Sequence, residues 1–212
     1  MERSPGPNSN KWQFEVFAQG GFVPAYKVYV PGSPIFARVD LEFYSLGCDA
    51  GMRIGDVRGR GPLRGRGEMM FELMPFWLGR YPAQSGLYED PGYPTFPNAK
   101  WSQKEEIFPG ASITPLLLRW NFTGEQPLRL IPWMQLGGGL LWTTHNFPDG
   151  ANGTSVFNFT PQLGAGVNVF RRPNQSLDFA VKVIHISNAG LGDHNPGLNQ
   201  TLQFSAGYSW WK

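Results

Sequence analysis

The sequence predicts an all-β protein, a single eight-stranded antiparallel up-and-down β-barrel over residues 1–212. Two observations support this fold. Charged residues make up only 16% of the chain and aromatic residues 15%, with 27 Gly and 19 Pro, a composition that suits many strands joined by turns. Apolar and polar residues also alternate in segment after segment, as they do in strands, because successive side chains of a strand point to opposite faces. We expect residues 1–10 to form a disordered extension.

Alternation places four strands in the first half of the chain. Trp12, Phe14 and Val16 are apolar whereas Gln13 and Glu15 are polar, so the first strand begins at Trp12. The segments that follow are a Pro/Gly loop over 20–37, a strand over 39–54, a Gly/Arg connection over 55–65, a strand over 68–77, a Pro-rich aromatic loop over 79–104 and a strand that closes at 116–120.

Four more strands follow in the second half. The predicted segments are a tight turn over 123–126, a strand over 128–142, a loop over 143–154, a strand over 157–163, a turn over 172–174, a strand that begins at 177 and a strand over 202–210. Longer and shorter connections alternate along the chain, as they do in up-and-down membrane barrels. No segment marks an internal domain boundary.

Alternation alone does not decide which face of the barrel is inside. A soluble lipocalin-like barrel buries its apolar face, whereas an outer-membrane barrel turns that face to lipid and keeps a polar lumen. Three features favour the outer membrane: the strands are long enough for a tilted span, aromatic residues cluster at strand ends, and the polar face carries both signs of charge. The charged residues of that face are Glu15, Asp40, Glu42, Glu68, Glu72, Arg119, Arg129 and Lys182. A soluble lipid carrier remains the alternative.

Other classes of protein fit the sequence less well. A net charge of +2 is too small to indicate nucleic-acid binding, and the single Cys48 excludes a disulfide framework and a thiolate metal site. No Asp/His cluster has the spacing of metal ligands, so the sequence implies no metal and no cofactor. The uncharged run 130–147 contains Pro132 and three consecutive glycines, which break helices. The N-terminus lacks the apolar core of a signal peptide, so we expect an exported protein whose signal is absent from this sequence.

A polar pair continues the apolar face of the seventh strand. Phe179, Val181 and Val183 alternate with polar or small residues, and His185 and Ser187 follow in phase with them. Side chains two residues apart are about 7 Å apart along a strand, close enough to meet. With both termini in the periplasm, this strand ends outward, so the pair is expected at the outer rim, facing lipid. A base beside a hydroxyl indicates nucleophilic catalysis, and polar groups facing lipid call for a reason, although a lone His is more often structural.

The residues around this pair resemble a known family. His185-Ile186-Ser187-Asn188-Ala189-Gly190-Leu191, followed by Asn195-Pro196-Gly197-Leu198, is similar to the signature of the lipid A 3-O-deacylases of PagL type, also named acyloxyacyl hydrolases. The resemblance is specific over the last two strands and covers about the first 150 residues only as general architecture. It implies an outer-membrane barrel that hydrolyses the ester-linked acyl chain at the 3 position of lipid A. Its partners are then lipid A or lipopolysaccharide and the lipids of the outer membrane.

The resemblance also implies a role for each residue of the motif. Ser187 would be the nucleophile and His185 the general base that takes its proton, since a serine hydroxyl is weak until a base activates it. Asn188 and Asn195 match family positions that hold the oxyanion of the tetrahedral intermediate. These residues have an alternative interpretation, because Asn and Gly are also common turn formers.

One position departs from the family pattern. The family has a Glu at the start of the last strand that orients the His, and this chain has Asn199 there, with Gln200 beside it and Asp193 in the preceding loop. An amide stabilises an imidazolium less well than a carboxylate does, and loss of the acid of a serine protease triad lowers the rate by up to about 10⁴-fold. We therefore expect weaker activity, or activity on another ester.

Two alternatives to lipid A deacylation stay open at this point. The chain could be a non-catalytic barrel with a structural or adhesive role, or an esterase of another acylated lipid. A homodimer is also left open. His145 and His194 lie in predicted loops and are expected to face solvent.

Overall fold

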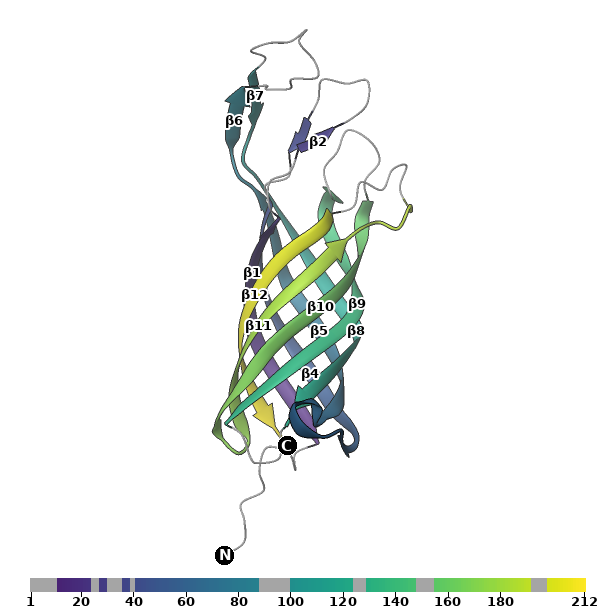
Figure 1. Ribbon diagram of the computed structural model, residues 1–212. Coiled ribbons are helices and arrows are strands. Elements are labelled where there is room, and N and C mark those ends of the chain that lie inside the picture. Colours follow the sequence, from purple (N-terminus) through teal and green to yellow (C-terminus); the bar gives the residue numbers. More distant parts are fainter. Residues whose placement is uncertain are drawn as a thin grey trace, which may run out of the picture.

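The computed structural model describes residues 11–23, 27–29, 36–38, 41–87, 100–123, 129–147, 155–191 and 198–212. Within them, eight long antiparallel strands close into one barrel (Figure 1). Its strands are β1 (Trp12–Val23), β4 (Leu41–Arg58), β5 (Gly65–Tyr81), β8 (Glu106–Phe122), β9 (Leu130–Phe147), β10 (Ser155–Arg172), β11 (Gln175–Ile186) and β12 (Leu198–Trp211). Each pairs with its neighbours in the chain, and β1 pairs with both β12 and β4, which closes the ring. The predicted eight-stranded barrel is confirmed; the extension over 1–10 lies outside the described residues.

Several strands are longer than predicted. Strand β9 runs to Phe147, into the predicted 143–154 loop, and β4 runs to Arg58, where a short 3-10 turn, η2 (Gly61–Leu63), precedes β5. The two longest predicted loops contain small hairpins, β2 (Lys27–Tyr29) with β3 (Phe36–Arg38) and β6 (Gln84–Leu87) with β7 (Lys100–Gln103). Alternation fades where both faces are polar or glycine-rich, but backbone pairing continues because the N–H and C=O groups still need partners.

The two ends of the barrel differ. The first and last described residues meet at one end, where the N–H groups of Lys11 and Trp12 donate to the carbonyl of Lys212 at 2.6 Å. The hairpins β2–β3 and β6–β7 project from the opposite end (Figure 1). We call these the terminal end and the loop end. Strand β11 starts at the tight turn over 173–174 at the terminal end and finishes at the loop end. The described residues include no helix long and apolar enough to span a membrane.

The outer surface of the barrel is apolar. Large side chains on every barrel strand are exposed there, among them Phe14, Leu46, Phe71, Leu118, Leu136, Phe159, Phe179 and Phe204. Exposing so much apolar surface to water is unfavourable, whereas contact with the hydrocarbon core of a bilayer is favourable. This arrangement is that of a membrane barrel and not of a soluble lipocalin-like one, which would bury the apolar face.

The lumen holds the polar face. The Nζ of Lys182 pairs with Glu72, which also accepts hydrogen bonds from Thr114 Oγ1 at 3.1 Å and Gln162 Nε2 at 2.9 Å. Arg119 donates from its Nη2 to Gln135 Oε1 at 2.8 Å. Charges of both signs therefore pair inside the barrel, as the sequence predicted. Two residues of the predicted polar face differ: Glu42 is half-buried and pairs with Arg80, and Arg129 is exposed; Asp40 lies outside the described residues.

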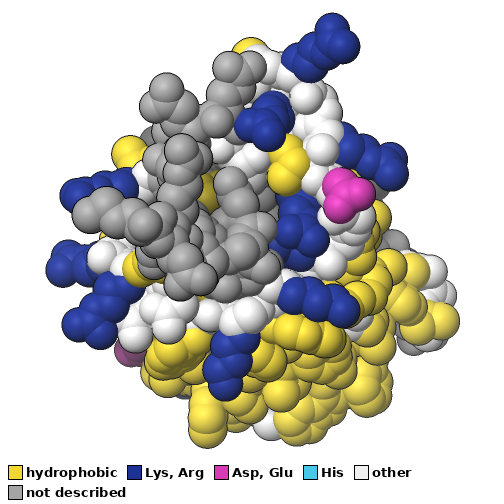
Figure 2. Space-filling view, turned by 90° about the horizontal axis from the view of Figure 1, so that it is seen from below, with side chains coloured by type: hydrophobic (Ala, Val, Ile, Leu, Met, Phe, Trp, Pro, Cys, Tyr) yellow, Lys and Arg dark blue, Asp and Glu magenta, His cyan; other side chains and the backbone are white. Residues whose placement is uncertain are grey.

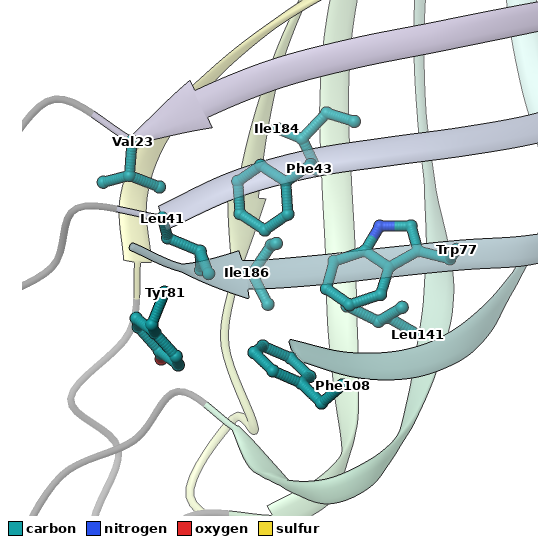
Figure 3. Packing of buried hydrophobic residues seen from close by; sticks show 9 residues of the cluster. All are labelled: Val23, Leu41, Phe43, Trp77, Tyr81, Phe108, Leu141, Ile184 and Ile186. Carbon is teal, nitrogen blue, oxygen red and sulfur yellow. The ribbon is translucent and has the colours of Figure 1, made fainter. Parts of the chain in front are cut away.

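Apolar clusters lie on both sides of this polar layer. The cluster at the loop end comprises Val23, Leu41, Phe43, Trp77, Tyr81, Phe108, Leu141, Ile184 and Ile186 (Figure 3). Its aromatic rings pack against one another in a tilted arrangement, with centroids 5.4 Å apart for Phe43 and Trp77 and 5.8 Å apart for Trp77 and Phe108. A second cluster at the terminal end contains Ile131, Phe170 and Trp211. The loop-end cluster includes two residues of β11, and so it fixes the end of the strand that carries the predicted site.

Candidate active site

The side chain of His185 points to the bilayer because the side chains of its two neighbours point into the lumen. Ile184 and Ile186 are buried in the loop-end cluster, and successive side chains of a strand point to opposite faces. His185 is half-buried and continues the line of Phe179 and Val183, which are exposed on the outer surface. The alternation of β11 therefore presents the imidazole sideways to the membrane at the loop end of the barrel, as the sequence predicted.

The pairing of β11 with β12 slips by one residue at His185. Ile184 pairs with Thr201, but Ile186 pairs with Leu198. One residue of β11, His185, therefore lies opposite two residues of β12, Asn199 and Gln200, which is the geometry of a β-bulge. Thr201 Oγ1 donates to the carbonyl of Ile184 at 2.8 Å, beside this irregularity.

The bulge brings the backbone of two predicted partners opposite the imidazole. Bulges re-aim side chains and are common next to active sites. The structure does not describe the side chains of residues 198–200, so the contact of Asn199 or Gln200 with His185 stays a prediction. Asp193, His194 and Asn195 lie outside the described residues.

Ser187 lies just past the end of β11. Its backbone forms an isolated bridge with Phe159 of β10: the Phe159 N–H donates to the Ser187 carbonyl at 2.7 Å, and the Ser187 N–H donates to the Phe159 carbonyl at 3.1 Å. The sequence predicted that Ser187 faces the lipid, but only 7% of the residue is exposed. Directly opposed residues of an antiparallel pair point to the same face, and Phe159 is exposed on the outer surface, so the bridge agrees with an outward direction of Ser187 although little of the residue is exposed.

A tight turn follows the serine. Ala189 N–H donates to Ser187 Oγ at 3.1 Å, Gly190 N–H donates to Asn188 Oδ1 at 3.0 Å, and Leu191 N–H donates to the Asn188 carbonyl at 3.0 Å. Asn188 is completely buried. Its side-chain oxygen therefore has the turn-forming role that the sequence left open beside the oxyanion role.

Backbone strain occurs in this same turn. Ala189 has φ = 52° and is the only non-glycine residue with a positive φ among those described. A left-handed conformation costs an L-residue roughly 1–2 kcal/mol, and such strain is often found at functional sites. Gly190 follows with φ = 80°, which a glycine adopts freely.

The structure thus brings together part of the predicted site. His185, Ser187 and Asn188 are consecutive or nearly so at the end of β11, and the backbone of Asn199 and Gln200 lies across from His185. The sequence reasoning missed the Ala189 N–H, which is directed at the serine oxygen. The available signal was a serine at the start of a turn. The oxygen of such a serine commonly accepts a hydrogen bond from the backbone N–H two residues later.

His145 lies apart from this group. It is exposed, as expected, but it belongs to strand β9 and not to a loop, and its Nδ1 is 3.1 Å from Thr144 Oγ1. Among the described residues, no three His, Cys, Asp or Glu side chains are grouped to hold a metal ion.

Comparison with known proteins places the chain beside outer-membrane barrels. The family model for lipid A 3-O-deacylase (PagL) matches residues 70–209. The crystal structure of the outer membrane enzyme PagL superposes with a TM-score of 0.50 at 19% identity, covering 92% of this chain and 98% of that one. The outer membrane protein OprG from Pseudomonas aeruginosa superposes with a TM-score of 0.54 at 10% identity, covering 99% of each chain.

Neisserial surface protein A also has the same barrel, with a TM-score of 0.50 at 16% identity, over 94% of this chain and 96% of that one. These identities are low, so the structural matches show a shared fold. No curated protein sequence matches significantly. The match of the family model covers most of the chain, including every described residue of the candidate site.

Proposed function

The chain belongs to the lipid A 3-O-deacylase (PagL) family, and from this premise we propose that it is an outer-membrane serine esterase that removes the ester-linked acyl chain at the 3 position of lipid A. The observation that carries the proposal is the position of His185 and Ser187. They lie at the loop end of a membrane barrel, with the imidazole on the bilayer face. With the termini in the periplasm, this end lies in the outer leaflet, where lipid A resides.

The proposed reaction has two steps. Ser187 Oγ attacks the ester carbonyl while His185 accepts the hydroxyl proton, and the protonated imidazole then gives that proton to the departing sugar oxygen. In the second step His185 takes a proton from water, the resulting hydroxide attacks the acyl-serine, and the proton returns to Ser187 as the fatty acid leaves. The apolar outer surface beside Phe159 and Val183 suits an acyl chain.

The tetrahedral intermediate needs hydrogen-bond donors for its oxyanion. The Ala189 N–H is already 3.1 Å from Ser187 Oγ, so it is our first candidate. Asn195, and the Nδ2 group of Asn188, are candidates from the family pattern. Asn188 Oδ1 accepts a hydrogen bond within the turn, and this bond holds the backbone around the serine rigid. The Nδ2 group of the same side chain is the part that could donate to the oxyanion.

Asn199 or Gln200 would orient the imidazole in place of the family Glu. Both lie opposite His185 at the bulge, and an amide oxygen can accept the N–H of a neutral imidazole. Asp193 remains a second substitute. An amide leaves the imidazolium less stabilised than a carboxylate does, which favours slow turnover.

The same departure from the family pattern favours a second candidate, a barrel that has lost catalysis or that acts on another acylated lipid. A lipid phosphonate that reacts only with activated serines separates these functions. We expect it to label the folded protein and the control variant Ser155→Ala, which lacks a half-buried serine on β10, but not Ser187→Ala. Equal labelling of all three, or no labelling of the folded protein, would count against an activated Ser187.

A further inference from the structure

Positive charge is concentrated at the terminal end of the barrel. Nine of the 17 Lys and Arg residues that the structure describes lie there: Lys11, Arg58, Arg60, Arg64, Arg66, Arg129, Arg171, Arg172 and Lys212. Asp56 is the only exposed acidic residue among the described residues of this end. Figure 2, which views the barrel from the terminal end, shows the basic side chains spread around the rim. We call these nine residues the basic collar.

The basic collar is a property of the rim and not of one loop. Its members lie at the ends of β1, β4, β5, β9, β10 and β12 and in the turn between β4 and β5, and they therefore surround the barrel. The side chain of Arg66 also has a structural contact, because its Nε donates to the carbonyl of Gly55 at 2.9 Å. Arg58, Arg60, Arg171 and Arg172 are exposed and account for much of the outward charge.

The arginines of the lumen and of the loop end differ from the collar. Arg53 is buried, with its guanidinium carbon 4.5 Å from the centre of the Trp211 ring. Arg80, towards the loop end, pairs with Glu42 at 2.8 Å and with Glu105 at 2.9 Å. Arg80 is thus paired with two carboxylates near the loop end, whereas Asp56 is the one exposed side-chain carboxylate near the collar among the described residues.

The collar directly borders the apolar outer surface of the barrel, which we call the apolar belt. Trp12, Ile54, Leu130 and Trp210 are exposed on the outer surface close to the same strand ends. Indole rings prefer the headgroup level of a bilayer, so this border marks the membrane interface. Guanidinium groups just beyond it are at the height of lipid phosphates, which they bind through paired N–H donors.

We propose that the basic collar binds the phosphate groups of anionic phospholipids in the leaflet at the terminal end. The position at the border of the belt favours membrane lipid over a soluble polyanion, because the apolar belt keeps the rim in contact with headgroups. Each cation near an anionic bilayer surface adds to the attraction, and the effect falls as salt increases. This inference does not depend on the proposed esterase activity.

The test measures which lipids surround the barrel. The refolded protein is placed in bilayers of phosphatidylcholine that contain spin-labelled phosphatidylglycerol or spin-labelled phosphatidylcholine, and the motionally restricted fraction of each label is recorded. We expect about threefold preference for phosphatidylglycerol at low salt, falling towards equality at about 0.5 M NaCl. Equal association of the two labels at low salt would overturn the proposal.

Two matched variants identify the residues responsible. The quadruple variant R58Q/R60Q/R171Q/R172Q should lose the preference, whereas R58K/R60K/R171K/R172K should keep most of it because the charge remains. Heat-modifiable migration in gels confirms that each variant is folded, and R171Q/R172Q replaces the quadruple variant if that one fails to fold. An undiminished preference in the folded Gln variant would contradict a role for the collar. A preference abolished by about 10 mM inorganic phosphate at constant ionic strength would indicate a free-phosphate site and overturn the lipid assignment.

Discussion

The backbone N–H of Ala189 donates a hydrogen bond to Ser187 Oγ, with 3.1 Å between the nitrogen and the oxygen. The bond uses the oxygen as an acceptor and does not engage the hydroxyl proton, which is the proton that a general base must remove. Ala189 maintains this arrangement in a left-handed conformation, φ = 52°. A strained backbone therefore positions a donor beside the proposed nucleophile.

Substitutions of Ala189 test whether this backbone shape matters. Ala189→Gly should change the free energy of unfolding by less than about 1 kcal/mol, because the relief of strain offsets the extra entropy of the unfolded glycine. Ala189→Val should destabilise the fold by roughly 1–2 kcal/mol or more and lower acyl release, because a β-branched residue is a poor fit to positive φ. Urea unfolding in lipid vesicles and the rate of fatty-acid release measure the two effects. Equal activity of the Val and Gly variants would argue against a precise backbone role.

His185→Gln should remove the proposed base while it retains a polar side chain on the bilayer face. We expect kcat to fall by about 10⁴-fold or more, as it does when one member of a catalytic unit is lost. His145→Gln is the matched control, because His145 also lies towards the loop end but is exposed on β9, away from the proposed site. Single-turnover hydrolysis of a lipid ester in micelles would show the difference. A loss of similar size in both variants would contradict a specific role for His185.

Asn199→Glu should restore the carboxylate that the family pattern places beside the His. If Asn199 orients His185 at the bulge, kcat should rise by roughly 10- to 10³-fold, since a carboxylate stabilises the imidazolium better than an amide does. Asn199→Gln is the control of equal size without the charge, and Gln200→Glu tests the neighbouring position. Steady-state rates at saturating substrate give the comparison. A rise with Gln200→Glu alone would move the orienting role to position 200, and no rise in either variant would exclude both.

The ion pair of Lys182 and Glu72 should matter for folding and not for chemistry. Lys182→Met leaves a buried carboxylate without its cation, which should lower the free energy of unfolding by about 3–5 kcal/mol. The double variant Lys182→Met, Glu72→Gln should recover most of that loss, because an amide can keep the hydrogen bonds with Thr114 and Gln162 without a charge. Equilibrium unfolding in vesicles would check both values. An equal loss in the single and double variants would contradict the assignment to an unpaired charge.

The sequence was enough for the barrel and for the direction of its faces. Alternation in segments such as Trp12–Val16 depends on the pleat of a single strand, so it can be read locally. The number of strands followed from it, whereas the apolar outer surface and the charged lumen were inferred from strand length, aromatic strand ends and the mixed charges of the polar face. Strand ends were less predictable, because pairing with a neighbour extends β4 and β9 past the point where the pattern fades.

The site was only partly predictable. The phase of β11 placed His185 on the bilayer face, but the low exposure of Ser187 and the strain at Ala189 occur where the strand gives way to a turn. The bulge opposite His185 depends on how β11 pairs with β12, so it cannot be predicted from the sequence of either strand alone. Such features depend on register, which local alternation does not encode.

The most direct test of the proposed function is mass spectrometry of lipid A from cells that express the chain behind a signal peptide. Cells that express Ser187→Ala are compared with them, with folding of both barrels confirmed by heat-modifiable migration. We expect lipid A to lose one 3-linked hydroxyacyl chain in the first cells and to stay intact in the second. Unchanged lipid A in cells with the folded unsubstituted barrel, or equal loss in both, would contradict deacylation by Ser187.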